Sequence, residues 1–217
     1  LYDPDKLTLP DSSVDFLEHK FSSKSPVIRD RVKDGCEYPM ASDEKRLRRC
    51  LASYYALISC IDMEIGRVLD YLEEIGELDN TIIFYTADHG DFAGEHGLFH
   101  KNLGLYDSIH RTPYLLSYPG GPKGLVPEAF AESVDLYPTL CELCDVPAPD
   151  CLDGESLVPV INGEEPGKTE AYCEWVWFNP DTKISAVCDK NYRMMYFGVL
   201  GYGEFYDLQK DPGEVNN

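Results

Sequence analysis

Apolar residues recur every three or four positions from residue 47 to residue 72, which is the spacing of one face of an α-helix. Ser42 can cap this helix, and Asp43 and Glu44 fall in its first turn, where the helix dipole favours negative charge. Gly76 is a natural stop. The pattern predicts one long helix with a single buried stripe, made of Leu47, Leu51, Tyr54, Ile58, Ile61, Ile65, Val68, Leu69 and Leu72.

A second pattern follows at residues 81–87, which are β-branched, aromatic and apolar on both faces. Such a run is typical of a strand in the middle of a sheet, with helices on both sides. Asp88-His89-Gly90 comes directly after it. Ligands of open α/β sheets bind beyond the carboxyl ends of the strands, so this tripeptide stands where a site is expected.

The remaining segments are shorter. Residues 1–40 are polar and interrupted by prolines, which predicts an irregular loop region. A short strand is expected at 114–118 and a helix at 133–144. After Pro166-Gly167 the pattern changes to four short strands, with a hairpin turn between the second and the third. These strands are expected at 171–177, 184–187, 192–197 and 204–208, and the turn at 189–191.

Taken together, these elements predict an α/β chain with two parts. Residues 1–167 form the α/β portion and residues 168–217 form a small antiparallel β subdomain. A chain of 217 residues, 43% of them hydrophobic, is long enough for one domain with a core of its own.

Composition excludes several classes of function. With 39 acidic and 19 basic residues the net charge is −20, so a polyanion would be repelled and no nucleic-acid partner is expected. No apolar run reaches the length of about 18 residues that a membrane span needs, and residues 1–10 do not form a signal peptide. The eight cysteines lack zinc-site spacing; Cys141 and Cys144 are expected to be core thiols. The cellular compartment stays undetermined.

The chemistry is concentrated around Asp88. A carboxylate and an imidazole both bind divalent cations, and Gly90 allows the backbone to pass close to what they bind. Taken alone, Asp88-His89-Gly90 is also explained by a turn with an Asx hydrogen bond. Lys101 follows thirteen positions later, in the same glycine-rich loop. A lysine beside a cation site is unfavourable unless an anion lies between the two positive charges, which indicates a tetrahedral oxyanion as the ligand.

In order and spacing, these segments resemble sulfatases of the alkaline phosphatase superfamily over residues 40–217. The resemblance rests on Thr86-Ala87-Asp88-His89-Gly90, on Gly94-Glu95-His96-Gly97 with Lys101, and on the tail Phe205-Tyr206-Asp207-Leu208. It also rests on residues 55–62, 65–69, 79–83, 111–113, 134–139, 154–157 and 209–214. It implies part of an alkaline-phosphatase-like sandwich with a mixed central sheet.

The resemblance also assigns roles. Asp88 and His89 match two metal ligands, although many sulfatases carry Asn at the second position. Lys101 matches the catalytic lysine that binds the sulfate group. His96 would stand behind the ligands without binding the metal, or it would be a loop histidine held by the backbone. The metal expected is Ca²⁺, with Mn²⁺ or Mg²⁺ as alternatives because histidine is a softer donor than Ca²⁺ usually takes.

One essential element of the family is not found in this chain. Sulfatases convert Cys or Ser in a C/S-x-P/A-x-R motif to formylglycine, and no cysteine or serine here has that context. The early Asp-Asp ligand pair is also absent. The resemblance therefore implies the carboxyl-terminal half of an enzyme, with the formylglycine nucleophile on an amino-terminal half. The 217 residues alone are expected to be an inactive fragment that can associate through the face left by that half.

Three functions stay open at this point. The chain would belong to a sulfuric ester hydrolase, to a phosphonate or phosphate ester hydrolase of the same superfamily, or to a non-catalytic degenerate paralogue. The substrate would be a sulfated small molecule or glycan, because aromatic side chains near the start of the carboxyl-terminal subdomain can stack on sugars. Core packing is the alternative use of these four residues, Tyr172, Trp175, Trp177 and Phe178.

Overall fold

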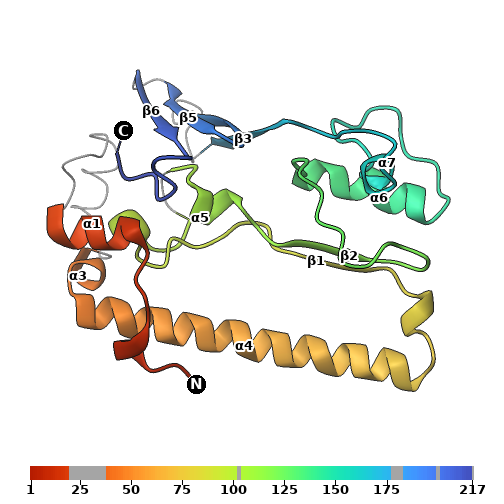
Figure 1. The fold of residues 1–217 in the computed structure, drawn as a ribbon, viewed down its shortest axis with the longest axis horizontal. Coiled ribbons are helices and arrows are strands. Elements are labelled where there is room, and N and C mark those ends of the chain that lie inside the picture. The colour runs from red at the N-terminus through yellow and green to blue at the C-terminus, as the bar shows by residue number, and fades with distance from the viewer. Residues whose placement is uncertain (20–37, 102–103, 177–182, 199–200, 217) are drawn as a thin grey trace.

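The computed structural model describes residues 1–19, 38–101, 104–176, 183–198 and 201–216. Figure 1 shows the long helix α4 (Glu44–Glu74) along one side of the molecule, with the ribbon of β1 (Ile83–Thr86) and β2 (Tyr114–Ser117) running beside it. On the far side of that ribbon lie the four-stranded carboxyl-terminal sheet and, separately, α6 (Leu136–Leu143) with α7 (Val158–Ile161). This arrangement is the mixed α/β architecture that the sequence predicts.

Helix α4 confirms the predicted long helix but corrects its cap and its burial. The cap is Asp43, one residue later than predicted, and its carboxylate accepts a hydrogen bond from the Arg46 N–H at 3.2 Å. The helix ends before Gly76, whose φ of 75° suits a glycine. Only the first turns are buried, at Leu47, Leu51 and Ala52.

The second half of α4 contradicts the prediction of one continuous buried stripe. Ile58, Ile61 and Val68 are 45%, 53% and 60% exposed. The described elements that pack most against α4 are two short helices at its first half, η1 (Pro4–Lys6) and α3 (Tyr38–Ala41), and η2 (Leu78–Asn80) at its end. Apolar side chains along the rest of the helix therefore stay in contact with solvent.

Strand β1 occupies the predicted run but is shorter, and within the described residues it pairs only with β2. The pairing is antiparallel, with Phe84 opposite Leu116. The described part of the chain thus does not place β1 in the middle of a sheet. A strand that is apolar on both faces requires neighbours to bury it, and Tyr85 and Leu115 remain 36% and 63% exposed.

The prediction of an irregular amino-terminal region was wrong for part of its length. Helix α1 (Asp11–His19) forms there, with Asp11 in its first turn. Its one large apolar anchor, Phe16, is 1% exposed and packs on Gly97, where an added Cβ would meet the Phe16 ring at 2.4 Å. Ser12 Oγ also donates to Glu95 Oε2 at 3.0 Å. Because α1 depends on contacts with a loop about 80 residues away, its own sequence carries little signal.

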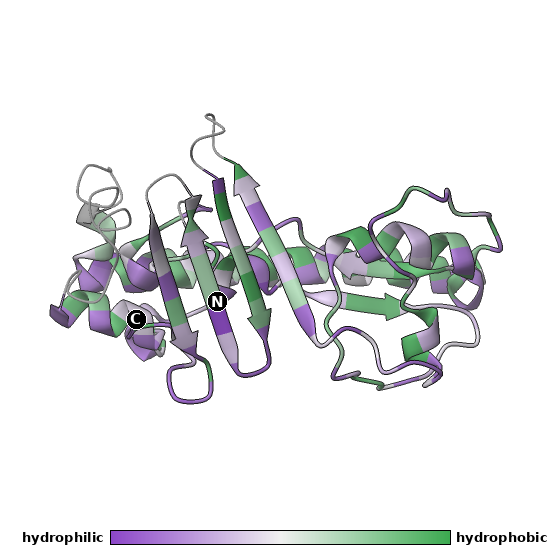
Figure 2. Cartoon of the chain, turned by 90° about the horizontal axis from the view of Figure 1, so that it is seen from above, coloured by the Kyte–Doolittle hydropathy of each residue, from purple (hydrophilic) through white to green (hydrophobic). Residues whose placement is uncertain are grey.

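The carboxyl-terminal strands form an antiparallel meander in the order β3-β4-β5-β6. Figure 2 shows the four strands side by side, with hydrophobic and hydrophilic residues alternating along them. Their bounds are Glu170–Val176, Lys183–Asp189, Tyr192–Phe197 and Tyr202–Asp207. The predicted hairpin turn is confirmed, since Asp189 Oδ1 accepts the N–H groups of Asn191 and Tyr192 at 2.7 Å. The boundary at residues 167 and 168 stays a prediction.

One face of this sheet packs on the loop that follows Asp88. The shared core includes Met195, Phe197 and Tyr206 from the sheet and Phe92 and Tyr106 from the loop. On the other side of the molecule, α6 follows the short helix η4 (Ser133–Asp135). The two helices together make up the predicted helix at 133–144. Cys141 is buried there, but Cys144 is exposed, so only one of the two predicted core thiols is in the core.

Candidate functional site

Asp88 and His89 lie side by side just beyond the end of β1. His89 Nε2 is 3.4 Å from Asp88 Oδ2, and the two side chains are 34% and 84% exposed. His89 Nδ1 is 2.7 Å from the carbonyl oxygen of Gly90. Because a carbonyl can only accept, Nδ1 carries a proton in this contact. In that tautomer the Nε2 lone pair and the Asp88 carboxylate face the same point, where one cation could be bound by both atoms.

This geometry fits a shared divalent cation. Two donors that each lie about 2.3–2.6 Å from one Ca²⁺, at right angles to each other, are roughly 3.3–3.7 Å apart. A metal-binding histidine usually donates its other ring N–H to a carbonyl or carboxylate, as His89 does to Gly90. An Asx turn would instead use the N–H of Gly90, but that group donates to the carbonyl oxygen of Ile109 at 2.7 Å.

The hydrogen bond from the Gly90 N–H to Ile109 holds the tripeptide Asp88-His89-Gly90 against the short helix α5 (Asp107–His110). An added Cβ at Gly90 would lie 1.9 Å from the carbonyl oxygen of Ser108, so only glycine allows so close an approach. Gly90, and with it the turn of Asp88 and His89, is therefore held by α5, an element that begins seventeen residues after Gly90.

The loop from Asp91 to Lys101 closes back on its own start. Asp91 Oδ1 accepts the N–H groups of Ala93 and His100 at 2.7 and 3.1 Å, and the Phe92 N–H donates to the carbonyl oxygen of His100 at 3.1 Å. The backbone just before Lys101 is thereby held against Asp91, three residues after Asp88. The Lys101 side chain is exposed.

His96 lies in the core. It is 2% exposed, has a φ of 53°, and its ring stacks on Tyr106 with the two ring centroids 4.1 Å apart. Phe92 meets the same ring edge-on, with the centroids 6.2 Å apart. His96 therefore supports the loop between Asp91 and Lys101 from the core side. That it supports the metal ligands without binding the metal stays a prediction.

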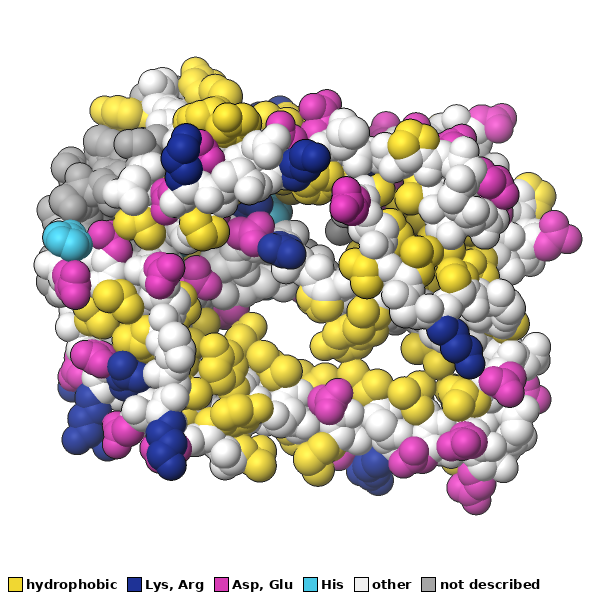
Figure 3. All heavy atoms as spheres, in the orientation of Figure 1, with side chains coloured by type: hydrophobic (Ala, Val, Ile, Leu, Met, Phe, Trp, Pro, Cys, Tyr) yellow, Lys and Arg dark blue, Asp and Glu magenta, His cyan; other side chains and the backbone are white. Residues whose placement is uncertain are grey.

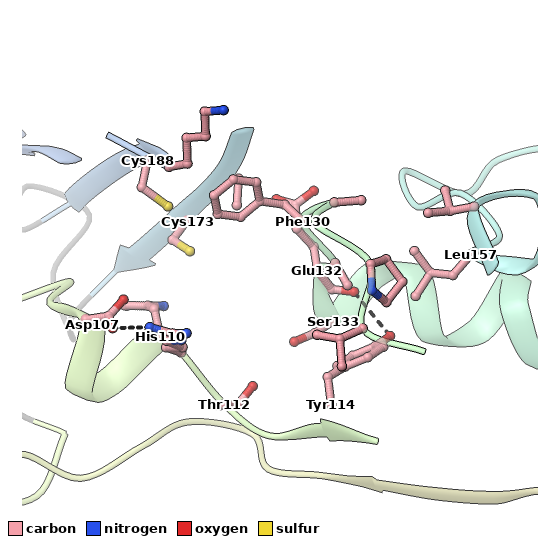
Figure 4. Close-up of a pocket in the computed structure, with 18 of the residues that line it drawn as sticks. Asp107, His110, Thr112, Tyr114, Phe130, Glu132, Ser133, Leu157, Cys173 and Cys188 are labelled. Carbon is pink, nitrogen blue, oxygen red and sulfur yellow. Dashed lines mark hydrogen bonds and ion pairs between the residues drawn. The ribbon is translucent and has the colours of Figure 1, made fainter. Parts of the chain in front are cut away.

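Asp88 also lines a pocket of about 910 Å³ between α5, β2, the edge of the carboxyl-terminal sheet and the segment before α6. Figure 4 shows His110 and Asp107 on one side of it, Cys173 and Cys188 above them, and Glu132 and Tyr114 opposite. Of the other predicted site residues, His89, His96 and Lys101 do not line this pocket. The structure thus brings Asp88 and His89 together and leaves Lys101 outside the pocket.

His110 is a residue that sequence reasoning missed. Its Nε2 is buried and has no hydrogen-bond partner among the described residues. Burial, and next the positive charge of Arg193, lower the pKa of His110 to about 4. The ring is therefore neutral at physiological pH. A histidine between Ile109 and Arg111 has no local pattern that distinguishes it from a surface residue.

Within the described part of the chain, no three His, Cys, Asp or Glu side chains are grouped so that they could hold a metal ion. Asp88 and His89 are an adjacent pair and nothing more. A complete site for a divalent cation needs further donors, about six to eight for Ca²⁺.

Comparison with known proteins agrees with these motifs. The family model described as "Sulfatase" matches residues 18–146, and the model described as "N-sulphoglucosamine sulphohydrolase, C-terminal" matches residues 94–217. The chain belongs to the sulfatase family. It is 36% identical over 183 residues to an N-acetylglucosamine-6-O-sulfatase of Bacteroides thetaiotaomicron, which covers 79% of this chain and 32% of that protein.

Two solved structures extend the likeness to the fold. One, a protein in complex with its substrate D-glucosamine-2-N,6-O-disulfate, is 32% identical with a TM-score of 0.73 and covers 91% of this chain and 42% of that chain. The other, a phosphonate monoester hydrolase from Silicibacter pomeroyi, is 27% identical with a TM-score of 0.83. The match covers 100% of this chain and 47% of that chain. The alkaline-phosphatase-like fold that the resemblance implies is confirmed.

The sulfatase chain spans about a third of the length of the curated relatives it matches. The expectation of a carboxyl-terminal half is consistent with this partial coverage. None of the described helices is both long enough and apolar enough to cross a membrane.

Proposed function

We propose that this chain supplies the Asp88 and His89 metal ligands and the Lys101 sulfate-binding lysine of a sulfuric ester hydrolase. The observation that carries the proposal is the facing of His89 Nε2 and Asp88 Oδ2 at 3.4 Å, with Nδ1 of the same ring hydrogen-bonded to the Gly90 carbonyl oxygen. Membership of the sulfatase family supports it. The formylglycine nucleophile would lie on an amino-terminal part that this sequence does not contain.

Each residue has a distinct task in this proposal. Asp88 supplies an exposed carboxylate, and Gly90 holds the His89 ring so that Nε2 faces the same point. The bound cation would polarise a sulfate oxygen. Lys101 would neutralise the negative charge on the other oxygens of the sulfate group. This charge increases as the ester bond breaks. Ca²⁺ is the metal proposed, and Mn²⁺ or Mg²⁺ is the alternative.

For the substrate we propose a sulfated glycan. A homologous structure contains a disulfated glucosamine, and the curated relative named above is an N-acetylglucosamine-6-O-sulfatase. The predicted aromatic cluster does not support this choice. Tyr172 and Trp175 are three residues apart on β3 and so point to opposite faces of the sheet; Trp175 packs against the core. Trp177 and Phe178 lie outside the described residues.

A phosphonate or phosphate ester hydrolase is the second candidate. The phosphonate monoester hydrolase of Silicibacter pomeroyi matches the whole chain, and Asp88, His89 and Lys101 would bind a phosphoryl group as well as a sulfate. The ratio of kcat/KM for an aryl sulfate to that for an aryl phosphonate distinguishes the two. A ratio above one supports the sulfatase, and a ratio below one supports the alternative.

The experiment uses the full-length gene product and two pairs of variants. Asp88→Ala should abolish metal retention, measured by elemental analysis after dialysis, whereas the matched control Asp79→Ala should retain it. Lys101→Ala should lower kcat for a sulfate ester by roughly 10² or more, whereas Lys123→Ala, also exposed, should not. Normal metal content in Asp88→Ala, or near-normal turnover in Lys101→Ala, would refute the corresponding assignment.

The degenerate paralogue is tested by sequence. If the coding sequence upstream of Leu1 contains a C/S-x-P/A-x-R motif and an early Asp-Asp pair, the catalytic proposal gains its nucleophile and its further ligands. If it continues without them, the non-catalytic function is the better account.

A further inference from the structure

The turn that carries Asp88 and His89 depends on α5, and α5 is too short to hold itself. Four residues form a single turn, and a helix of that length is not stable without tertiary contacts. The Gly90 N–H donates to the carbonyl oxygen of Ile109, a member of this turn. Whatever fixes α5 therefore also fixes the position of the predicted metal ligands.

An ion cluster fixes α5, in which Arg193 and Glu214 are buried and the Asp107 side chain is 38% exposed. Arg193, on β5, is 5% exposed; its Nη2 lies 2.7 Å from Asp107 Oδ1 and its Nη1 donates to the carbonyl oxygen of Leu105 at 3.2 Å. The same guanidinium lies 3.3 Å from Oε1 of Glu214, which is 2% exposed. Glu214 Oε2 in turn accepts the Asp107 N–H at 2.8 Å. Both ends of the cluster converge on the first residue of α5.

This cluster joins three distant parts of the chain, namely α5, strand β5 and the carboxyl-terminal tail. Asp107 neutralises the guanidinium and is itself held by Glu214 through its N–H group. A buried charge that loses its partner is strongly unfavourable, so the members of such a cluster hold one another in place. The carboxyl-terminal sheet and tail thus reach the Asp88–Gly90 turn through the cluster at Asp107, the backbone of α5 and the hydrogen bond from Gly90 to Ile109.

We propose that Arg193 and Asp107 are positioning residues for the metal ligands. Together they hold α5 in place, and α5 holds the Asp88–His89–Gly90 turn in place. They do not touch the metal or the substrate. This inference rests on the proposed function for its second half, because it takes Asp88 and His89 as ligands. Its first half, the mechanical link from Arg193 to Gly90, stands on the hydrogen bonds alone.

The test compares Asp107→Asn with the wild-type full-length gene product. Asparagine keeps the shape and an acceptor oxygen but removes the charge. Exchange of the Gly90 amide should rise about tenfold or more relative to the amide of Leu51, a buried residue of α4 that reports global opening. The dissociation constant for Mn²⁺, used as the probe metal, should rise by about 10- to 100-fold, as expected when a residue that orients the ligands indirectly is lost.

Two further variants separate positioning from general folding. Arg193→Lys keeps the charge and should retain part of the affinity, whereas Arg193→Met should lose it, if it folds. Activity of Asp107→Asn should return to within about threefold of wild type at saturating metal, because the chemistry itself is intact. The matched control is Arg67→Met, which removes an exposed ion pair of 2.7 Å with Glu64 on α4 and should change none of these readouts.

Failure of this inference and failure of the proposed function give different results. If Asp88→Ala loses metal while Asp107→Asn changes neither Gly90 exchange nor Mn²⁺ affinity, the positioning role is wrong and the metal assignment stands. Equal acceleration of Gly90 and Leu51 exchange also refutes positioning, since it indicates global destabilisation. If Asp107→Asn accelerates Gly90 exchange but neither it nor Asp88→Ala alters Mn²⁺ binding, the mechanical link stands and the metal assignment is wrong.

Discussion

The two halves of α4 carry the same apolar spacing and have opposite surroundings. At the first half, Leu47 and Leu51 are 0% and 2% exposed. Leu47 packs against the loop after Asp88, where an added Cβ on Gly94 would meet it at 2.1 Å. At the second half, the side chains of Ile58, Ile61 and Val68 are exposed to solvent. Figure 3 shows hydrophobic side chains gathered along α4 and on the elements facing it, around an open space.

This difference shows that periodicity specifies an apolar face but does not specify what covers it. Strand β1 leads to the same conclusion, because it is apolar on both faces and has one neighbour in the described chain. Asp88 lies where β1 ends and Gly90 lies where the packed region begins, so the predicted ligands stand at the border between the two. The association that the sequence predicts would use this open apolar face.

The largest expected difference between the two halves is in stability. Leu47→Ala should lower the free energy of unfolding of the chain by about 2–5 kcal/mol, because it leaves a cavity in a packed site. Ile61→Ala, at an exposed site, should change it by less than about 0.5 kcal/mol. Urea unfolding of both variants measures the contrast. In the full-length gene product Ile61→Ala should become costly too; equal effects in the isolated chain would remove the distinction.

His110 gives a pH-dependent measure of the packed side. Burial and then Arg193 lower its pKa to about 4 in the folded chain, whereas an unfolded histidine has a pKa of about 6.5. The unfolded state binds the proton more tightly, so the stability contribution of neutral His110 is complete above about pH 6.5, decreases as the pH falls below that value, and is lost by about pH 4.

Between pH 7 and pH 4.5 this linkage should remove roughly 2 kcal/mol from the free energy of unfolding. The variant His110→Gln, which has no proton to gain, should lose that much less over the same interval. Parallel stability profiles of wild type and His110→Gln would show that the histidine is not buried as described.

A smaller effect is expected on association. If the open half of α4 drives self-association of the chain, Ile61→Gln and Val68→Gln should each weaken it by roughly tenfold, which is about 1.4 kcal/mol of lost apolar contact. The control Ser53→Gln lies on the same helix at an exposed polar position. Analytical ultracentrifugation measures the dissociation constants. Unchanged values for both α4 variants would place the contact elsewhere.

Local patterns predicted much of the fold because their physics is local. The spacing of α4, the alternation in β3 to β6 and the turn at Asp189 depend on residues near one another in sequence. The adjacency of Asp88 and His89 was predictable for the same reason. Helix α1 was not, because it forms around one residue, Phe16, that is buried by Gly97.

The contacts around the site are made by residues that are far apart in the sequence, so no local sequence pattern predicts them. Arg193 and Asp107 are 86 residues apart, and Glu214 binds an N–H 107 residues away. Each of these residues looks like an ordinary surface charge in the sequence. The burial of His96 against Tyr106 is also a tertiary effect, since a histidine in the segment Gly94-Glu95-His96-Gly97 suggests an exposed loop.

The most direct test of the account is an assay of the 217-residue chain by itself, with an aryl sulfate and added Ca²⁺ or Mn²⁺. The chain has no cysteine or serine in a C/S-x-P/A-x-R context, and its described part holds only the pair Asp88 and His89 where a cation needs about six donors or more. We expect no turnover above background from the isolated chain, and we expect the full-length gene product to hydrolyse the ester. Turnover by the isolated chain that disappears in Lys101→Ala would contradict the account, because it would require a nucleophile within these 217 residues.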